Sequence, residues 1–72
     1  MNKSELMEML EEILETEEDV LSEETVLEDL EEWDSLGKLS LMAMAKKECD
    51  KSLTATEIRE FVTVNDICNA LL

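Results

Sequence analysis

The chain contains no histidine and no proline, and it has one glycine and two cysteines among its 72 residues. Without histidine there is no imidazole base for a serine or cysteine nucleophile, and two cysteines alone cannot form the usual four-ligand zinc site. One glycine cannot build the glycine-rich loop that cradles nucleotide phosphates. The acidic stretch at 17–24 lacks the alternating ligands and central glycine of an EF-hand. We therefore expect neither an enzyme nor a metal site.

Basic residues are scarce, and they are unevenly distributed. Six Lys and Arg stand against twenty Asp and Glu, for a net charge of −14. Residues 1–36 hold fifteen acids and one lysine, whereas residues 37–72 hold five of each, so the first half carries the whole excess. Because no basic surface is available to neutralise phosphates, neither nucleic acid nor an anionic membrane is an expected partner. A basic patch on another protein would complement the first half, and a merely solubilising acidic surface is the alternative.

Long apolar runs are also absent, since no stretch approaches the roughly 20 residues of a membrane span. The N-terminus lacks the apolar segment of a signal peptide, so a cytoplasmic protein without membrane insertion is expected. The hydrophobic fraction of 44% nevertheless favours a compact fold over disorder. Residues 1–72 are expected to form a single domain, with Cys49 and Cys68 as buried free thiols.

Apolar residues recur at helical spacing rather than in alternation, which predicts an all-α fold. A first helix is expected at about 4–14, a central one at 35–49, a short one at 55–59, and a last one from Val64. Thr54 with Glu57 and Thr63 with Asp66 have the spacing of N-terminal caps. The predicted architecture is a small antiparallel bundle of three main helices plus one short helix.

A long acidic connection at 15–34 separates the first two predicted helices. A loop of this length in a small domain is expected to be functional or anchored. A short helical turn is expected within 25–30, with the loop ordered over the bundle and its acids pointing outward. The candidate anchors are the apolar residues of the segment, namely Val20, Leu21, Val26, Leu27, Leu30 and Trp33.

The tripeptide Asp34-Ser35-Leu36 follows this loop and opens the central helix. Asp34 is a favourable N-cap, because its carboxylate can accept from the free N–H groups of the first turn. Ser35 then occupies the first helical position near solvent, where the helix dipole favours an attached anion such as a phosphate. Leu36 is expected to turn inward against the core. Gly37 is expected to leave the surface around Ser35 open.

Together these features resemble the acyl carrier protein family. A long loop in a small acidic helical domain leads into Asp34-Ser35-Leu36, and a central helix follows at once. Leu53, a short helix and the passage at 61–64 then lead into the last helix, as in that family. The resemblance covers nearly all 72 residues.

The resemblance implies that Ser35 is the attachment point of 4′-phosphopantetheine, transferred from coenzyme A by a separate, magnesium-dependent phosphopantetheinyl transferase. The arm would end in a thiol that holds an acyl or aminoacyl group as a thioester. Loading and acyl-transfer enzymes would be the other partners, and the carrier itself would act as a monomer without catalysing a reaction. Asp34 and Leu36 match the motif's flanking positions, which imply helix capping and contact with the transferase.

The chain departs from the fatty-acid members of the family just after Ser35. Those members usually have acids there, which dock on basic partner surfaces, whereas this chain has Gly37, Lys38 and Ser40. Trp33 replaces a small residue often found before the motif, and it could shield the arm, meet a partner or pack the loop end on the bundle. These differences favour a specialised carrier serving a dedicated pathway, with fatty acyl, polyketide and aminoacyl cargo all open.

The expected partner-recognition residues are the neighbours of Ser35 in the sequence, namely Trp33, Asp34, Leu36, Gly37 and Lys38. A hypothesis of a different class also remains open. In it the chain is an acidic helical interaction module that has no prosthetic group and binds a basic partner through its first half.

Overall fold

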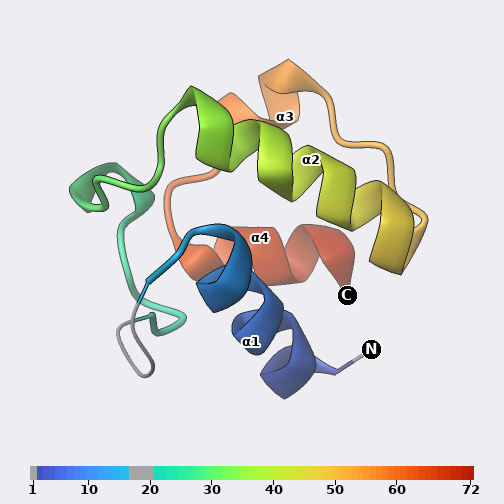
Figure 1. The fold of residues 1–72 in the computed structure, drawn as a ribbon, viewed down its shortest axis with the longest axis horizontal. Helices are drawn as coiled ribbons and strands as arrows, with labels where there is room; N and C mark the ends of the chain where they lie inside the picture. The colour runs from blue at the N-terminus through green and yellow to red at the C-terminus, as the bar shows by residue number, and fades with distance from the viewer. Residues whose placement is uncertain (1, 17–20) are drawn as a thin grey trace.

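The computed structural model describes residues 2–16 and 21–72, and in this part of the chain the predicted all-helical fold is confirmed (Figure 1). A one-turn 3-10 helix lies at Leu27–Asp29, within the segment where a short turn was predicted. The bounds predicted for the first three α-helices agree with the observed ones to within one residue. The α-helices are α1 (Lys3–Ile13), α2 (Ser35–Cys49), α3 (Ala55–Glu60) and α4 (Val64–Leu71).

The three longer helices pack together, and the short α3 lies beside α2. In Figure 1, α1 runs from right to left, whereas α2 and α4 both run from left to right. The helix α1 is therefore the one that lies antiparallel to the other two. Within the described ranges, none of the helices has both the length and the apolar character needed to cross a membrane.

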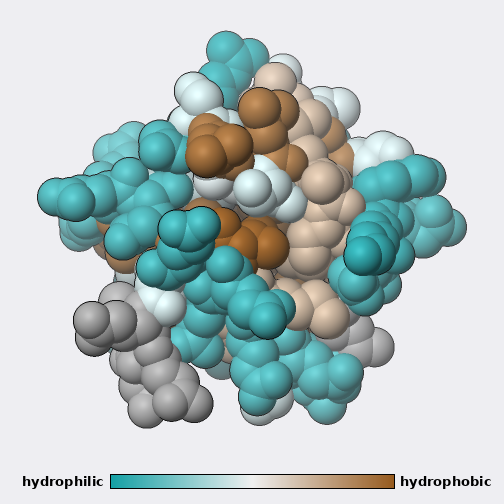
Figure 2. Space-filling view, in the orientation of Figure 1, coloured by the Kyte–Doolittle hydropathy of each residue, from teal (hydrophilic) through white to brown (hydrophobic). Residues whose placement is uncertain are grey.

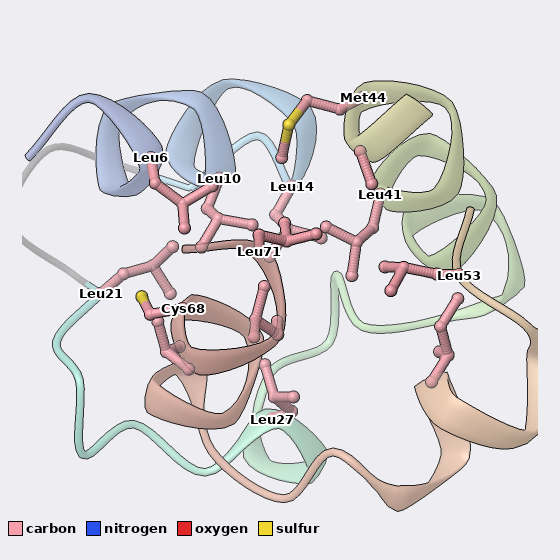
Figure 3. Close-up of a cluster of buried hydrophobic side chains, with 14 residues drawn as sticks. Leu6, Leu10, Leu14, Leu21, Leu27, Leu41, Met44, Leu53, Cys68 and Leu71 are labelled. Carbon is pink, nitrogen blue, oxygen red and sulfur yellow. The ribbon is translucent and has the colours of Figure 1, made fainter. Parts of the chain in front are cut away.

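The hydrophobic core lies where the three longer helices meet (Figure 3). Leu6 and Leu10 in α1 and Leu14 at its C-cap are buried, whereas Met9 and Ile13 lie at the edge of the core. In α4 the whole predicted stripe is buried, since its residues recur at i, i+3, i+4 and i+7 on one face. The buried residues of this stripe are Val64, Ile67, Cys68 and Leu71.

Both cysteines are thiols that form no disulfide, as predicted, but they differ in burial. Cys68 is buried in the core, and burial raises the pKa of its thiol above the ordinary value. Cys49, at the end of α2, is only half-buried, so the prediction that both thiols are buried is wrong for this residue. The reason is its position in the last turn of α2, where the helix leaves the core.

The long connection between α1 and α2 is held by side chains and by the backbone. Leu21 and Leu27 are buried in the core, and Leu30 packs against it, as the anchoring prediction requires. Val26 is instead 37% exposed, and its backbone forms an isolated antiparallel bridge with Thr63. The predicted anchor Val20 lies outside the described residues.

The connection is hydrogen-bonded to the segment between α3 and α4 and to the start of α4, a pairing that local spacing could not predict. The Leu27 N–H donates to the Val62 carbonyl oxygen at 2.9 Å, and the Asn65 N–H donates to the Glu23 carbonyl oxygen at 2.9 Å. These hydrogen bonds satisfy loop backbone groups that would otherwise need water. They hold the α1–α2 connection in place before the start of α2.

The carboxylate of Asp66 holds the segment between α3 and α4, to which the α1–α2 loop is hydrogen-bonded. Its Oδ2 accepts hydrogen bonds from the backbone N–H groups of Val62 at 2.9 Å and Thr63 at 3.1 Å. These two bonds, that from Val62 first, lower the pKa of Asp66 below its ordinary value. The depressed pKa means that the ionised form stabilises the folded protein. The stabilisation is fully present above an unfolded-state pKa of about 4 and is lost as pH falls through the lower folded pKa.

We predict that Asp66→Asn is less stable than the parent near neutral pH, and that this difference shrinks as pH falls below about 4. Thermal melts across this range provide the measurement. Glu60→Gln is the matched control, because it removes one exposed negative charge from the end of α3. A difference between Asp66→Asn and the parent that stays constant with pH would contradict the prediction.

The apolar residues of α2 are not covered on every side of the helix. Its residues Leu41, Met44 and Ala45 are buried, but Leu36 is 73% exposed and Leu39 is 61% exposed. A chain of this size has too few helices to surround a central one, so α2 has a buried face and an apolar face that remains outside. Figure 2 shows brown and pale-brown side chains gathered over α2 on the viewed face.

Candidate functional site

Ser35 is the first residue of α2, and its side chain is exposed. Asp34 caps the helix as predicted, because its Oδ1 accepts a hydrogen bond from the Gly37 N–H at 2.9 Å. The Asp34 carbonyl oxygen accepts from the Lys38 N–H at 2.9 Å, which closes the first helical turn. The first N–H groups of a helix have no intrahelical partner, and the helix dipole is positive at this end. An anion attached to the Ser35 oxygen is therefore electrostatically favoured.

The expected open surface around Ser35 is present, since Ser35 is exposed, but Gly37 does not form part of it. Gly37 is buried, and a Cβ at this position would collide with the Glu32 carbonyl oxygen and approach Leu14 Cδ2 to 3.1 Å. The glycine therefore lets the loop backbone lie directly against α2. This contact determines the path of the backbone through Trp33 and Asp34 to the start of α2, and hence the position of Ser35.

We predict that Gly37→Ala destabilises the protein even though alanine favours helix. Overpacking costs about 1–3 kcal/mol, and the helix preference of alanine returns about 1 kcal/mol. A backbone carbonyl cannot rotate away as a side chain can, so we expect the upper part of this overpacking cost, about 2–3 kcal/mol, and hence a net loss of about 1–2 kcal/mol and a fall in Tm of roughly 4–16 °C. Thermal melts of Gly37→Ala and of Ser40→Ala provide the test. Ser40→Ala gains helix preference without adding an atom, and an equal Tm for both variants would refute the clash.

Leu36 points outward, so the prediction that it turns into the core is wrong. Leu36 is 73% exposed, whereas its neighbour Gly37 is buried. Because Gly37 is on the side of the helix that faces the core, Leu36 is directed toward solvent. Leu39, one turn later, is 61% exposed. Two apolar side chains therefore lie beside the Ser35 hydroxyl on the outer face of α2.

Trp33 is half-buried and packs against the core, which supports the packing role among the three that were considered. Its indole also faces a cation, since Lys38 Nζ lies 5.8 Å from the ring centroid. A lysine at this distance is attracted by the negative face of the ring. The ring thus limits the directions in which the Lys38 side chain can extend near Ser35.

A cavity of about 280 Å³ lies between α2 and α3, with Ser35 at its margin. Its wall is mainly apolar, and its two charged lining residues are cations. The lining residues are Ser35, Lys38, Leu39, Met42, Ala55, Ile58 and Arg59. Sequence reasoning missed this cavity. The capping box located α3 along the chain, but no local signal placed α3 beside Ser35.

In the part of the chain that the structure describes, no group of three or more Cys, Asp or Glu side chains could hold a metal ion. The geometry around Ser35 instead suits a covalently attached anionic group. It provides an exposed hydroxyl, a helix N-terminus and an adjacent apolar cavity with cations.

The model of the family described as "Phosphopantetheine attachment site" matches residues 4–71. The chain belongs to this family. Its members carry a covalent 4′-phosphopantetheine on a serine, and they are carriers rather than enzymes. As carriers they interact with transferases and acyl-handling enzymes in general. No curated relative and no solved structure gave a match.

The residues around Ser35 fit the group that this carrier family bears. Among the other serines, the Ser22 hydroxyl lies 3.1 Å from Thr25 Oγ1, and Ser40 is half-buried within α2. Ser4 is exposed in the first turn of α1 but does not line the cavity, and Ser52 is exposed in the segment before α3. Ser35 combines exposure with the N-terminus of a 15-residue helix and a margin of the apolar cavity. When bound, the prosthetic group would supply a thiol at the end of a long arm.

Proposed function

We propose that Ser35 bears the 4′-phosphopantetheine arm, and that the protein holds acyl or aminoacyl groups as thioesters on it for delivery to other enzymes. The observation that carries this proposal is the exposed Ser35 hydroxyl at the start of α2, directly after the Asp34 cap. A phosphodiester formed there would keep its negative charge at the positive end of the helix dipole.

The phosphopantetheinyl transferase must reach this hydroxyl, and the loading and acyl-transfer enzymes must reach the thiol at the end of the arm that it bears. We propose that they contact Asp34, Leu36 and Lys38 directly, together with the exposed part of Trp33. Gly37 is buried, so it would influence recognition only through the loop that it positions. We further propose that residues 1–72 form one domain that acts as a cytoplasmic monomer.

We propose that the carrier is a specialised one, because the face beside Ser35 is not acidic. The first turns of α2 present Leu36, Lys38 and Leu39, and its last turns carry Lys46 and Lys47. Such a face does not complement a basic docking surface of the kind that acidic carriers use. An enzyme with an apolar docking site would complement the two exposed leucines.

The direct test is incubation with coenzyme A, magnesium and a broad-specificity phosphopantetheinyl transferase, followed by intact-mass measurement. The expected result is a mass increase of one phosphopantetheine group per chain. An unchanged mass under conditions that load another carrier would overturn the proposed function. It would favour the alternative of an acidic interaction module without a prosthetic group.

A further inference from the structure

The charged residues that line the cavity beside Ser35 are basic, although the chain as a whole is strongly acidic. Twenty acids and six bases make up the charged residues, yet this cavity is lined by Lys38 and Arg59 and by no carboxylate. Three other hollows, of about 450, 400 and 310 Å³, are each lined by at least two Glu or Asp residues. The cavity at Ser35 therefore differs from them in being suited to an anion.

The two cations approach the cavity from different helices. Lys38 follows Ser35 by three residues, so both lie on the same side of α2. Its ammonium lies over the ring of the partly buried Trp33. Arg59 comes from α3, where its guanidinium donates to Thr56 Oγ1 at 3.4 Å. Residues with cationic side chains, one from α2 and one from α3, thus line the same cavity as Ser35.

The rest of the cavity wall is mainly apolar. Leu39 and Met42 line it from α2, and Ile58 lines it from α3. Its volume of about 280 Å³ is slightly below the range of about 300–1,000 Å³ that is usual for small-molecule sites. A cavity of this size suits part of a flexible arm and would not also enclose a long acyl chain.

On the basis of the proposed attachment at Ser35, we propose that Lys38 and Arg59 bind the phosphodiester of the arm, and that the arm lies in this cavity. The phosphodiester adds one negative charge to a chain that already carries −14, so nearby cations relieve repulsion at the attachment point. Charge-assisted hydrogen bonds from ammonium and guanidinium groups are the strong form of this contact. The adjacent carboxylate of Asp34 is engaged with the Gly37 N–H. The resting carrier therefore holds its arm against α2 and α3, and a partner must draw it out.

The test compares apo and phosphopantetheine-loaded forms of the parent, Lys38→Gln and Arg59→Gln, with Lys47→Gln as the matched control. Lys47 is an exposed cation of the same helix, but it lines a different hollow, between α1 and α2. Intact mass confirms complete loading of every variant before Tm is measured at low salt. Each variant's own apo form is its reference, so the loss of the Trp33 contact or of the Thr56 hydrogen bond cancels.

We expect the loaded-minus-apo difference in Tm to fall by roughly 2–5 °C in Lys38→Gln and in Arg59→Gln, and to be unchanged in Lys47→Gln. High salt should reduce the effect by screening. In the loaded parent, nuclear Overhauser contacts are expected between the methyl groups of the arm and the side chains of Leu39, Met42 and Ile58.

An equal fall in all three variants would show a general charge effect and overturn the inference, as would an arm without contacts to those side chains. Failure of this inference is distinguishable from failure of the proposed function. A chain that loads fully but shows no dependence on Lys38 and Arg59 retains the carrier function and loses only the arm-binding role. A chain that takes up no phosphopantetheine loses both.

Discussion

Ser35→Ala is expected to take up no phosphopantetheine under conditions that load the parent chain completely. The variant lacks the only atom of residue 35 that can form the phosphodiester, and intact mass reports the outcome directly. Because the side chain is exposed at the first position of α2, the substitution should change the free energy of unfolding by no more than about 0.5 kcal/mol. A loss of loading would then reflect the missing hydroxyl rather than unfolding.

Ser40→Ala is the matched control, since it makes the same chemical change on the same helix. Ser40 is half-buried and lines the hollow between α1 and α2, away from the proposed attachment point. It should load to the same extent as the parent. Mass gain by Ser35→Ala would place the arm on another serine, which peptide mapping would identify. Loss of loading in Ser40→Ala alone would also contradict the assignment of Ser35.

Leu27→Ala is expected to be the most destabilising of the substitutions considered, at about 3 kcal/mol, or a fall in Tm of roughly 12–24 °C. The Leu27 side chain is completely buried, and it reaches the core from the loop that precedes the site (Figure 3). Truncation removes buried apolar atoms and leaves a cavity. Small domains have only modest stability, so this loss is a large part of the total. Thermal or urea unfolding measures it.

Leu36→Ala provides the comparison for Leu27→Ala, because it truncates the same residue type at a site that is 73% exposed. Its unfolding free energy should change by less than about 0.5 kcal/mol. Its rate of loading by the transferase should fall, since the proposal places Leu36 in contact with that enzyme. Strong destabilisation by Leu36→Ala would restore the original prediction of an inward-facing side chain.

Local sequence patterns were sufficient for the helices and for the N-terminal caps of α2, α3 and α4. The boundaries of α2 follow from Asp34, whose carboxylate caps the first turn, and from the apolar run that begins directly after it. The capping box of Thr54 and Glu57 likewise determines the start of α3. Each of these features depends on atoms only three or four residues apart, so a single stretch of sequence contains all the information.

The side-chain directions around Ser35 were less predictable, because they depend on what lies beside α2. Leu36 and Gly37 are adjacent, and hydropathy alone favours burial of the leucine. The structure buries the glycine instead, because the Glu32 backbone and Leu14 occupy the space that any side chain would need. The helix is thereby rotated so that Leu36 faces solvent.

By itself, the sequence determined the all-helical class, the caps, the placement of Ser35 at the start of the central helix and the concentration of acids in the first half. These are properties of short segments and of composition. Only the tertiary structure decided that the α1–α2 loop pairs with the α3–α4 segment, that Gly37 is covered, and that Arg59 and Lys38 line the same cavity. Each of these contacts joins residues that are distant in the chain or depends on how a helix is rotated about its axis. Such contacts are determined by packing of the whole core, which local spacing does not encode.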